Sequence, residues 1–416
     1  DRRLFSAHLM GACWKPADPG LDCGETMPFD SPGGFGLYVH WPFCVSKCPY
    51  CDFNSHVADS VDQDTWRSGL LAELNYYGIK TKGRHLDTVF FGGGTPSLMP
   101  PATAAAVLDA LSAYWTLAAD IEITLEANPS SAEARKFEDF KTAGVNRISI
   151  GVQSFDDAAL RFLGRGHGAE EAKEAVTIAK RTFDRSSFDL IYALPGQQPE
   201  EWARQLDEAL AFDTGHLSLY QLTVEKGTKF YSDQRDGAFD PLNDELAADL
   251  YDLTTEMTTN KGLNGYEVSN YAVGGLESRH NLIYWRGGDY IGIGPGAHGR
   301  LTIDGTRYRT EQAPLPGNWL SMREERGNAT RIFSVISEAE LKIECIMMGL
   351  RLVAGIDRRL FAAITGADLL DCIDTGSAYL LQEAGLIEID GTHLRATEAG
   401  RQRLNALIEA LVPDFD

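Results

Sequence analysis

The sequence has no run of apolar residues near the ~20 that a membrane-spanning helix needs. Its amino end also lacks the basic, apolar and small-residue succession of a secretory signal peptide. Basic residues are few, since 38 Lys and Arg stand against 60 Asp and Glu for a formal net charge of −22. Because nucleic-acid phosphates are bound by a basic face, this balance disfavours a nucleic-acid partner. Only seven cysteines occur, three of them clustered, which disfavours a disulfide framework and predicts a cytoplasmic location.

Composition and length describe an ordinary globular chain with one large domain and one or two smaller ones. The hydrophobic content is 44% over 416 residues. Residues 1–33 carry several prolines and glycines without an apolar period, which predicts a flexible leader. Cys13 and Cys23 fall within it, and a second metal site there is the alternative interpretation.

From residue 37 onward, apolar β-branched runs alternate with amphipathic stretches. The runs predict strands at residues 37–41, 88–91, 121–126, 147–152, 187–194 and 216–222. The stretches between them predict helices at residues 62–77, 101–115, 131–143, 169–183 and 200–212. This alternation indicates an α/β fold with a parallel sheet covered on both faces. Six strands are too few for a closed eight-stranded barrel.

The tail, residues 333–416, has a different pattern. Helices are expected at residues 338–352, 358–364 and 378–384, followed by Asp390-Gly391 between two short apolar runs, which is a hairpin signal. Thr397 and an expected helix at residues 398–412 complete a winged-helix-like pattern. Acidic residues crowd this segment, so a small lid or docking domain is favoured over DNA binding.

The most informative stretch is Cys44-Val-Ser-Lys-Cys48-Pro-Tyr-Cys51. Three thiolates within eight residues can each bind one iron of a [4Fe–4S] cluster, for which four cysteines are the usual complement. One iron is then left without a protein donor, and an open metal position is where a substrate or cofactor binds. A zinc site is the alternative, but it normally needs a second Cys or His pair, which does not follow here.

Further motifs follow the expected strands. Gly92-Gly93-Gly94-Thr95-Pro96 ends the second strand, where bare glycines let the backbone approach a ligand closely. Polar residues occur at or beside the ends of the next three strands: Glu126, Gln153, Arg165 and Asp189. Because buried polar groups at strand ends need partners, we expect them to converge on one pocket. For any one of them, a solvated strand-end residue is the alternative interpretation.

A second unusual stretch contains His280-Asn281-Leu-Ile-Tyr284-Trp285, followed by a glycine-rich run that ends at His298. Imidazole is a common axial haem ligand, and aromatic faces suit a flat macrocycle. A hydrogen-bonded structural histidine is the alternative for His280.

The C-x3-C-x2-C spacing with Tyr50 before the third cysteine resembles the radical S-adenosylmethionine (SAM) superfamily. That resemblance implies an open (β/α)6 partial TIM barrel and SAM chelated by the open iron. The segments around Cys51–His56, Gly92–Pro96, Leu125–Pro129, Gly151–Phe155 and His280–Trp285 are similar to one branch. It is the oxygen-independent coproporphyrinogen III dehydrogenase-like branch, and the similarity is greatest to its HemW haem chaperones.

The resemblance implies four units: a leader (1–33), the barrel core (34–230), a barrel-completing region with the His280 element (231–332) and a HemN/HemW-type helical, winged-helix-like domain (333–416). It implies that the cluster-bound SAM contacts Tyr38, Gly93, Glu126 and His298. It also implies contacts around a second SAM from seven residues: Tyr50, Gly94, Thr95, Gln153, Arg165, Asp189 and Thr223. Thr223 departs from the small apolar residue expected at its position.

Two members of the branch differ from each other in two features that can be checked in this sequence. The dehydrogenase carries a fourth cysteine where this chain has Phe53, and it lacks the His280 element. The resemblance therefore implies a haem chaperone that binds haem through His280 and transfers it to a respiratory protein at the membrane surface. The alternatives are the dehydrogenase, which oxidatively decarboxylates coproporphyrinogen III, and an iron–sulfur protein with an unknown radical substrate. Whether the protein is an enzyme, and whether it is a homodimer, stays open.

Overall fold

The structure is a computed structural model that describes residues 31–58 and 60–412. Most of the expected leader, with Cys13 and Cys23, lies outside the described residues. Within the described part, no helix has the length and apolarity that a bilayer crossing requires.

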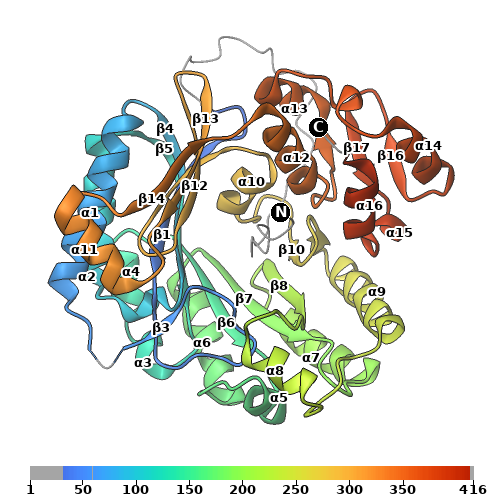
Figure 1. Cartoon of the computed structure of the whole chain (residues 1–416). Coiled ribbons are helices and arrows are strands. Elements are labelled where there is room, and N and C mark those ends of the chain that lie inside the picture. Colours follow the sequence, from blue (N-terminus) through green and yellow to red (C-terminus); the bar gives the residue numbers. More distant parts are fainter. Residues whose placement is uncertain (1–30, 59, 413–416) are drawn as a thin grey trace.

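A curved twelve-stranded sheet forms the larger part of the molecule (Figure 1). Its strand order is β14-β13-β12-β11-β1-β4-β5-β6-β7-β8-β10-β9. The six central strands are parallel: β1 (Phe35–Trp41), β4 (His85–Gly93), β5 (Thr116–Ala127), β6 (Arg147–Gln153), β7 (Arg185–Tyr192) and β8 (His216–Gln221). These are the six strands that the sequence predicts, in chain order.

The sheet continues beyond the predicted strands at both ends. The added strands are β9 (Asn264–Gly265), β10 (Asn270–Ala272), β11 (Asp289–Ile293), β12 (His298–Ile303), β13 (Thr306–Gln312) and β14 (Thr330–Val335). β11 runs parallel to β1, whereas β12, β13 and β14 are antiparallel. The antiparallel strands alternate in burial, so their residues do not form the continuous apolar runs of a strand buried on both faces.

Helices cover the outer face of the sheet. They are α1 (Gln63–Lys80), α2 (Pro101–Ala110), α3 (Ser131–Ala134), α4 (Phe137–Thr142), α5 (Asp157–Phe162), α6 (Ala169–Thr182), α7 (Pro199–Ala211), α9 (Asp244–Asn260) and α11 (Pro316–Arg326). α8 (Lys229–Arg235) instead lies against the segment before Cys51, where the Phe230 N–H donates to the Pro49 carbonyl at 2.8 Å. The expected helix 131–143 is wrong as one element, because Arg135 and Lys136 interrupt it. The second piece buries Phe137 and Phe140 in the core.

Local chemistry explains where such a helix begins and how it packs. At α7, Gln198 and Glu201 form a capping box, and Pro199 occupies the first turn, where its missing N–H costs nothing. Trp202, Leu206 and Ala209 follow at helical spacing and are buried against the sheet.

A short helix, α10 (Arg279–Trp285), lies on the inner side of the curved sheet rather than outside it (Figure 1). It contains the His280 element, and six of its seven residues are buried. The backbone N–H of His280 donates to Glu122 Oε1 at 3.0 Å, and Arg279 pairs with Asp120 at 2.7 Å. These bonds fix α10 against β5.

The chain ends in a separate helical unit with its own three-stranded sheet. Its elements are α12 (Glu338–Gly349), β15 (Ile356–Asp357), α13 (Arg358–Thr365), α14 (Thr375–Glu383), β16 (Ile387–Ile389), β17 (His393–Ala396), α15 (Glu398–Arg401) and α16 (Leu404–Leu411). The expected hairpin at Asp390-Gly391 is confirmed as β16–β17. The expected helix 398–412 is two helices, and Gly400 packs directly on the Leu386 carbonyl in the first of them. Glycine also weakens helix propagation at that point.

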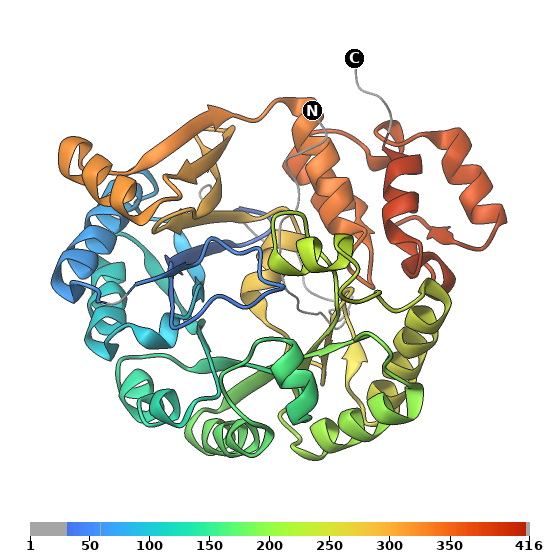
Figure 2. The same ribbon diagram turned by 60° about the horizontal axis from the view of Figure 1, so that its bottom comes forward.

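This C-terminal unit bridges the two ends of the open sheet. Figure 2 shows it between α9 (yellow) and the outer antiparallel strands (orange). On one side Arg300 of β12 pairs with Glu344 of α12 at 2.8 Å, and on the other Gln402 donates to Asp252 of α9 at 2.6 Å. The bridge closes one wall of the cavity described below.

Candidate functional site

The three clustered cysteines lie on a loop whose base is closed by a two-strand ladder. β2 (Phe43–Cys44) pairs in parallel with β3 (His56–Val57), so the intervening residues form a tethered loop beyond the end of β1. The Cys51 N–H donates to the Cys48 carbonyl at 3.2 Å, which bends the loop between these two residues. All three thiols are half-buried.

Each sulfur has a hydrogen-bond partner from outside the Cys44–Cys51 motif. Thr95 Oγ1 donates to Cys44 Sγ at 3.4 Å, and Arg165 Nη1 donates to Cys48 Sγ at 3.3 Å. Cys51 Sγ lies 4.0 Å from Ser55 Oγ. Donors aimed at sulfur stabilise the thiolate form, which is the form that binds metal.

The donor set fits an iron–sulfur cluster. Burial raises the pKa of the Cys44 and Cys51 thiols, so without metal they stay protonated. Within the described residues, no group of three or more His, Cys, Asp or Glu side chains is arranged so that it could hold a single metal ion. A cluster does not require such convergence, because each thiolate binds a different iron.

Asn128, which the sequence analysis did not single out as a ligand, connects two of the expected site residues. Its Nδ2 donates to Thr95 Oγ1 at 3.1 Å, and its Oδ1 accepts from Arg165 Nη2 at 2.6 Å. The partners on Cys44 and Cys48 are therefore joined through one amide. The signal available in the sequence was an Asn two residues after the strand-end Glu126.

A cavity of about 420 Å³ lies on the inner side of the sheet, between it and the C-terminal unit. It brings together all four residues expected at the cluster-bound SAM: Tyr38, Gly93, Glu126 and His298. His280 and Tyr284 of α10 line the same cavity, as does Phe53 of the cysteine loop. Two expected sites that are 154 residues apart in sequence, at Glu126 and His280, thus share one space.

Glu126 and Asp189 lie near one another in the barrel interior. Glu126 Oε2 accepts a hydrogen bond from the Gly93 N–H at 3.2 Å. Desolvation, with the charge of Asp189 adding to it, raises the pKa of Glu126 to about 8. Desolvation also raises the pKa of Asp189 to about 6. At neutral pH, Glu126 is therefore largely protonated and can donate a hydrogen bond as well as accept one.

His280 is fully buried, and both of its ring nitrogens have partners. Nδ1 lies 2.7 Å from Thr88 Oγ1, and Nε2 lies 2.8 Å from Tyr284 OH. The ring stacks on Phe90 with centroids 5.1 Å apart. Burial lowers the pKa of His280 to about 3, so the imidazole is neutral at physiological pH. Its role as a haem ligand stays a prediction.

The residues expected around a second SAM do not line the cavity, and they divide into two sets. Tyr50, Thr95 and Arg165 surround the cysteine sulfurs. The others are more dispersed: Gly94 approaches the Phe43 backbone, Gln153 ends β6 at a φ of 72°, Asp189 lies inside the barrel, and Thr223 is exposed after β8. A non-glycine residue at positive φ is strained, and such strain concentrates at functional sites.

Asn54 ties the cysteine loop to the loops that follow β11 and β13. Its Nδ2 donates to the carbonyls of Pro295 and Pro314, at 2.9 Å each. Its own carbonyl is hydrogen-bonded to His40 Nε2 at 2.9 Å. Pro295 lies three residues before His298, so the loop that leads to His298 is linked to the cysteine loop through the Asn54 side chain.

The charged residues on the far wall of the cavity were not expected from the sequence. Arg300 and Arg307, from neighbouring strands, and Glu344 from α12 all line it. Arg300 pairs with Glu344, 44 positions away, and no local sequence pattern reports such a contact.

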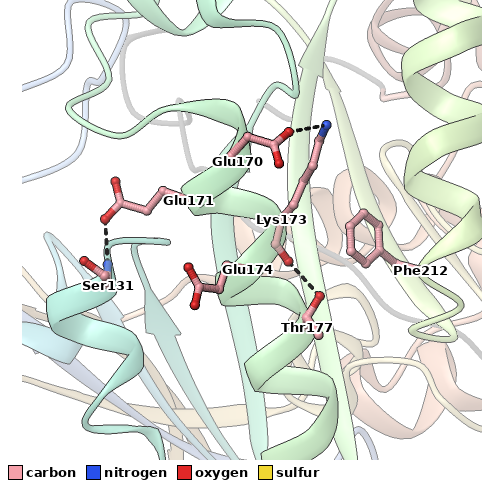
Figure 3. A pocket seen from close by; sticks show the side chains of 7 residues that line it. All are labelled: Ser131, Glu170, Glu171, Lys173, Glu174, Thr177 and Phe212. Atoms are coloured by element: carbon pink, nitrogen blue, oxygen red, sulfur yellow. Dashed lines mark hydrogen bonds and ion pairs between the residues drawn. The ribbon is translucent and has the colours of Figure 1, made fainter.

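A second depression lies on the outer surface, between α6 and its neighbours (Figure 3). Three of its seven lining residues are glutamates, and two of these have partners in the same lining: Glu171 accepts from the Ser131 N–H at 2.7 Å, and Glu170 pairs with Lys173 at 3.1 Å. No expected site residue lines it.

Comparison with known proteins agrees with this arrangement. Residues 38–209 match the family described as the radical SAM superfamily, and residues 336–403 match the HemN C-terminal domain. The Bos taurus protein named radical S-adenosyl methionine domain-containing protein 1, mitochondrial, is 40% identical over 99% of this chain and 94% of its own length. The chain belongs to the radical SAM superfamily. The expected family and α/β fold class are confirmed.

Other radical SAM relatives refine this placement. The Escherichia coli protein named heme chaperone HemW is 39% identical over 91% of this chain and 98% of its own length. A solved structure titled as E. coli coproporphyrinogen III oxidase (HemN), a radical SAM enzyme, has a TM-score of 0.76 over 90% of this chain and 89% of that chain. At 21% identity that likeness concerns the fold alone.

Membership of the radical SAM superfamily implies a [4Fe–4S] cluster and SAM. Cys44, Cys48 and Cys51 would hold the cluster, which supplies an open iron for SAM. Among the relatives, several are named mitochondrial and others are bacterial, so the cytoplasmic location stays a prediction.

Proposed function

We propose that this protein is a haem chaperone that binds haem in the cavity beside His280 and transfers it to haem-requiring respiratory proteins. The observation that carries the proposal is the shared cavity, in which His280 lies together with Tyr38, Gly93 and Glu126. The relatives named heme chaperone HemW cover nearly the same length of chain. A volume of about 420 Å³ falls within the range that small-molecule sites occupy.

The chemistry of His280 suits a metal ligand. A neutral imidazole is the ligating form, and burial keeps His280 neutral. Ligation through Nε2 requires the Tyr284 hydroxyl to swing away from it. The Thr88 hydroxyl, 2.7 Å from Nδ1, then orients the ring from behind, as partners of metal-bound histidines commonly do.

The walls beside His280 suit a flat apolar ring. Phe90 and Tyr284 contribute aromatic faces, while Leu341, Met347 and Met348 approach from α12. Aromatic and thioether side chains pack well against a conjugated macrocycle.

Coproporphyrinogen III dehydrogenation is the alternative function, and Phe53 counts against it. This residue stands where the resemblance places a fourth cysteine in the dehydrogenase, and its phenyl ring lines the cavity. In the proposed function, the cluster and SAM would control the assembly state of the protein or its transfer of haem to the recipient. The residues of this chain bind and orient them from the cysteine loop and the ends of β4 and β5.

The test is an anaerobic haem titration of the cluster-reconstituted protein, followed by Soret absorbance. We expect saturable one-to-one binding that His280→Ala abolishes or weakens at least tenfold. His216→Ala is the matched control, because His216 is also buried inside the barrel and lies 2.6 Å from a tyrosine hydroxyl, that of Tyr266. His216 does not line the cavity.

Unchanged binding in His280→Ala would remove the role of that residue. No saturable binding in the unmodified protein, together with anaerobic turnover of coproporphyrinogen III in the presence of SAM and a reductant, would establish the alternative.

A further inference from the structure

An ion pair spans the cavity wall between the sheet and the C-terminal unit. Arg300 of β12 meets Glu344 of α12 through Nε at 3.0 Å and Nη2 at 2.8 Å, a two-pronged contact. The side chains are 13% and 16% exposed, and both line the cavity. Such a fork is the geometry in which a guanidinium binds any carboxylate, whether it belongs to the protein or to a ligand.

Arg300 is the cavity cation that a ligand can engage. The other arginine in the lining, Arg307, is held by an ion pair with Asp289 and donates to the carbonyls of Gly287 and Gly288. The lining histidines are not cations at neutral pH, because burial lowers the pKa of His40 to about 4 and of His280 to about 3. Burial also lowers the pKa of His298.

Two tyrosine rings connect His280 to Arg300. Tyr284 OH lies 2.8 Å from His280 Nε2, and the rings of Tyr284 and Tyr290 meet edge to face with centroids 4.4 Å apart. Tyr290 is the cross-strand partner of Arg300 in the β11–β12 ladder. A ligand that reaches from the imidazole to the guanidinium therefore needs a flat apolar body and an acidic edge.

Glu344 sits on the same face of α12 as the apolar residues that approach the cavity. Leu341, Glu344, Cys345 and Met348 are spaced by three and four positions, and all line it. Figure 1 shows α12 on the far side of α10 from the sheet. If another carboxylate replaced that of Glu344, the Arg300 guanidinium would keep both of its hydrogen bonds. The ion pair that joins α12 to β12 would be lost.

We propose that Arg300 binds a carboxylate of the cavity ligand, a haem propionate, and that Glu344 occupies this carboxylate position when the ligand is absent. The inference rests on the proposed function. It adds Arg300 as the group that recognises the acidic edge of the macrocycle. It also couples ligand entry to the release of the C-terminal unit, because the ligand carboxylate replaces that of Glu344 on Arg300.

The test compares haem with haem dimethyl ester, whose propionates carry no charge. Each is titrated into the reconstituted full-length protein, unmodified and as Arg300→Gln, Glu344→Gln and Arg309→Gln. Arg309 is the matched control, because it also joins the sheet to α12, at 3.5 Å from Glu340, but does not line the cavity. Thermal unfolding of each variant reports whether it folds.

We expect Arg300→Gln to weaken haem binding ten- to a hundredfold, as loss of a charged hydrogen-bond pair does, while dimethyl ester binding changes less than about twofold. Glu344→Gln removes the competing carboxylate and should tighten haem binding only. Arg309→Gln should leave both affinities unchanged.

Equal loss of haem and dimethyl ester in Arg300→Gln would overturn the inference, because it would show a purely structural link between the two units. So would equal affinity of the unmodified protein for the two ligands. Failure of the unmodified protein to bind either one would instead overturn the proposed function and this inference together.

Discussion

Three buried acids, of which only Glu126 lines the cavity, give the protein a distinctive response to pH. Glu126, with a pKa of about 8, and Glu73 and Glu267, each with a pKa of about 7, all hold their protons more tightly than an exposed carboxyl does. Desolvation is the main cause in each case. Buried histidines act in the opposite direction, because burial lowers their pKa values, as at His280.

The unfolded chain still releases imidazole protons up to about pH 7.5, so the buried histidines add some stability over the first part of the interval from pH 6.5 to 8. The buried carboxyls contribute a loss of stability over the whole interval, because the unfolded chain has already released the carboxyl protons that the folded state gives up only as the pH passes each raised pKa. We expect Glu126→Gln to remove on the order of 1 kcal/mol of this loss. Urea unfolding of the cluster-free protein at pH 6.5 and pH 8 measures it, and an equal loss in the variant would contradict the assignment.

Gly93 is a residue whose backbone and surroundings both exclude a side chain. Its φ is 112°, and a Cβ there would meet His40 Cε1 at 2.6 Å. Gly83 has a φ of 88° but nothing within 4 Å of its Cβ position. Gly83→Ala should cost about 1–2 kcal/mol from the backbone alone.

We expect Gly93→Ala to cost about 1–3 kcal/mol more than Gly83→Ala, because the His40 ring must also shift. Urea denaturation of both variants gives the difference. Equal costs would show that the His40 contact adds nothing.

Among the elements, α10 most clearly joins structure to the proposed function. It lies inside the sheet with His280 held between Thr88 on β4 and Tyr284 one turn along the helix. Thr88→Val and Tyr284→Phe each remove one of these partners while keeping the shape of the side chain.

Both substitutions should destabilise the protein by about 1–3 kcal/mol, since each leaves a buried nitrogen without its partner. Their effects on haem affinity should have opposite signs. Tyr284→Phe frees Nε2 and should strengthen binding, whereas Thr88→Val removes the group that orients the ring and should weaken it. Soret titrations of the two variants decide this, and weakening by both would contradict ligation through Nε2.

The central strands could be predicted from sequence because each is apolar over several residues, as in Val89–Phe91 of β4. The outer strands could not, because β13 contains Arg307, Arg309 and Glu311, and its polar side chains resemble those of a loop. Helix ends were also uncertain where no proline or glycine marks them, as between α3 and α4.

At the scale of the whole molecule, Asp289 joins strands that the sequence separates widely. It pairs with Arg84 at 2.6 Å and with Arg307, and its Oδ2 accepts from the Thr302 N–H at 2.7 Å. The carboxylate is fully buried. Removal of its charge leaves two buried guanidinium groups without an ion-pair partner.

We expect Asp289→Asn to cost about 3–5 kcal/mol of unfolding free energy, as does loss of one partner in a buried ion pair. Asp120→Asn is the control, because Asp120 pairs with Arg279 but its side chain is 81% exposed, and it should cost about 0–1 kcal/mol. Chemical denaturation compares them. Similar values for the two would refute the importance of the buried group.

The cysteine motif and Glu126 indicated the position of the candidate site, since parallel strands bring their carboxyl ends together. The expected convergence of the strand-end residues on one pocket was wrong for Gln153, Arg165 and Asp189, which do not line the cavity. The Arg300–Glu344 pair did not follow from the sequence, because it depends on how the C-terminal unit docks against β12. The same holds for Asn54, whose two acceptors lie more than 240 residues away.

The sheet and the C-terminal unit have separate hydrophobic cores, and the cavity lies where they meet. Part of its wall exists only while the two units are docked, so a molecule bound there stabilises the contact between them. Cargo occupancy should then be visible in calorimetry: the empty protein melts in two steps, and the loaded protein in one.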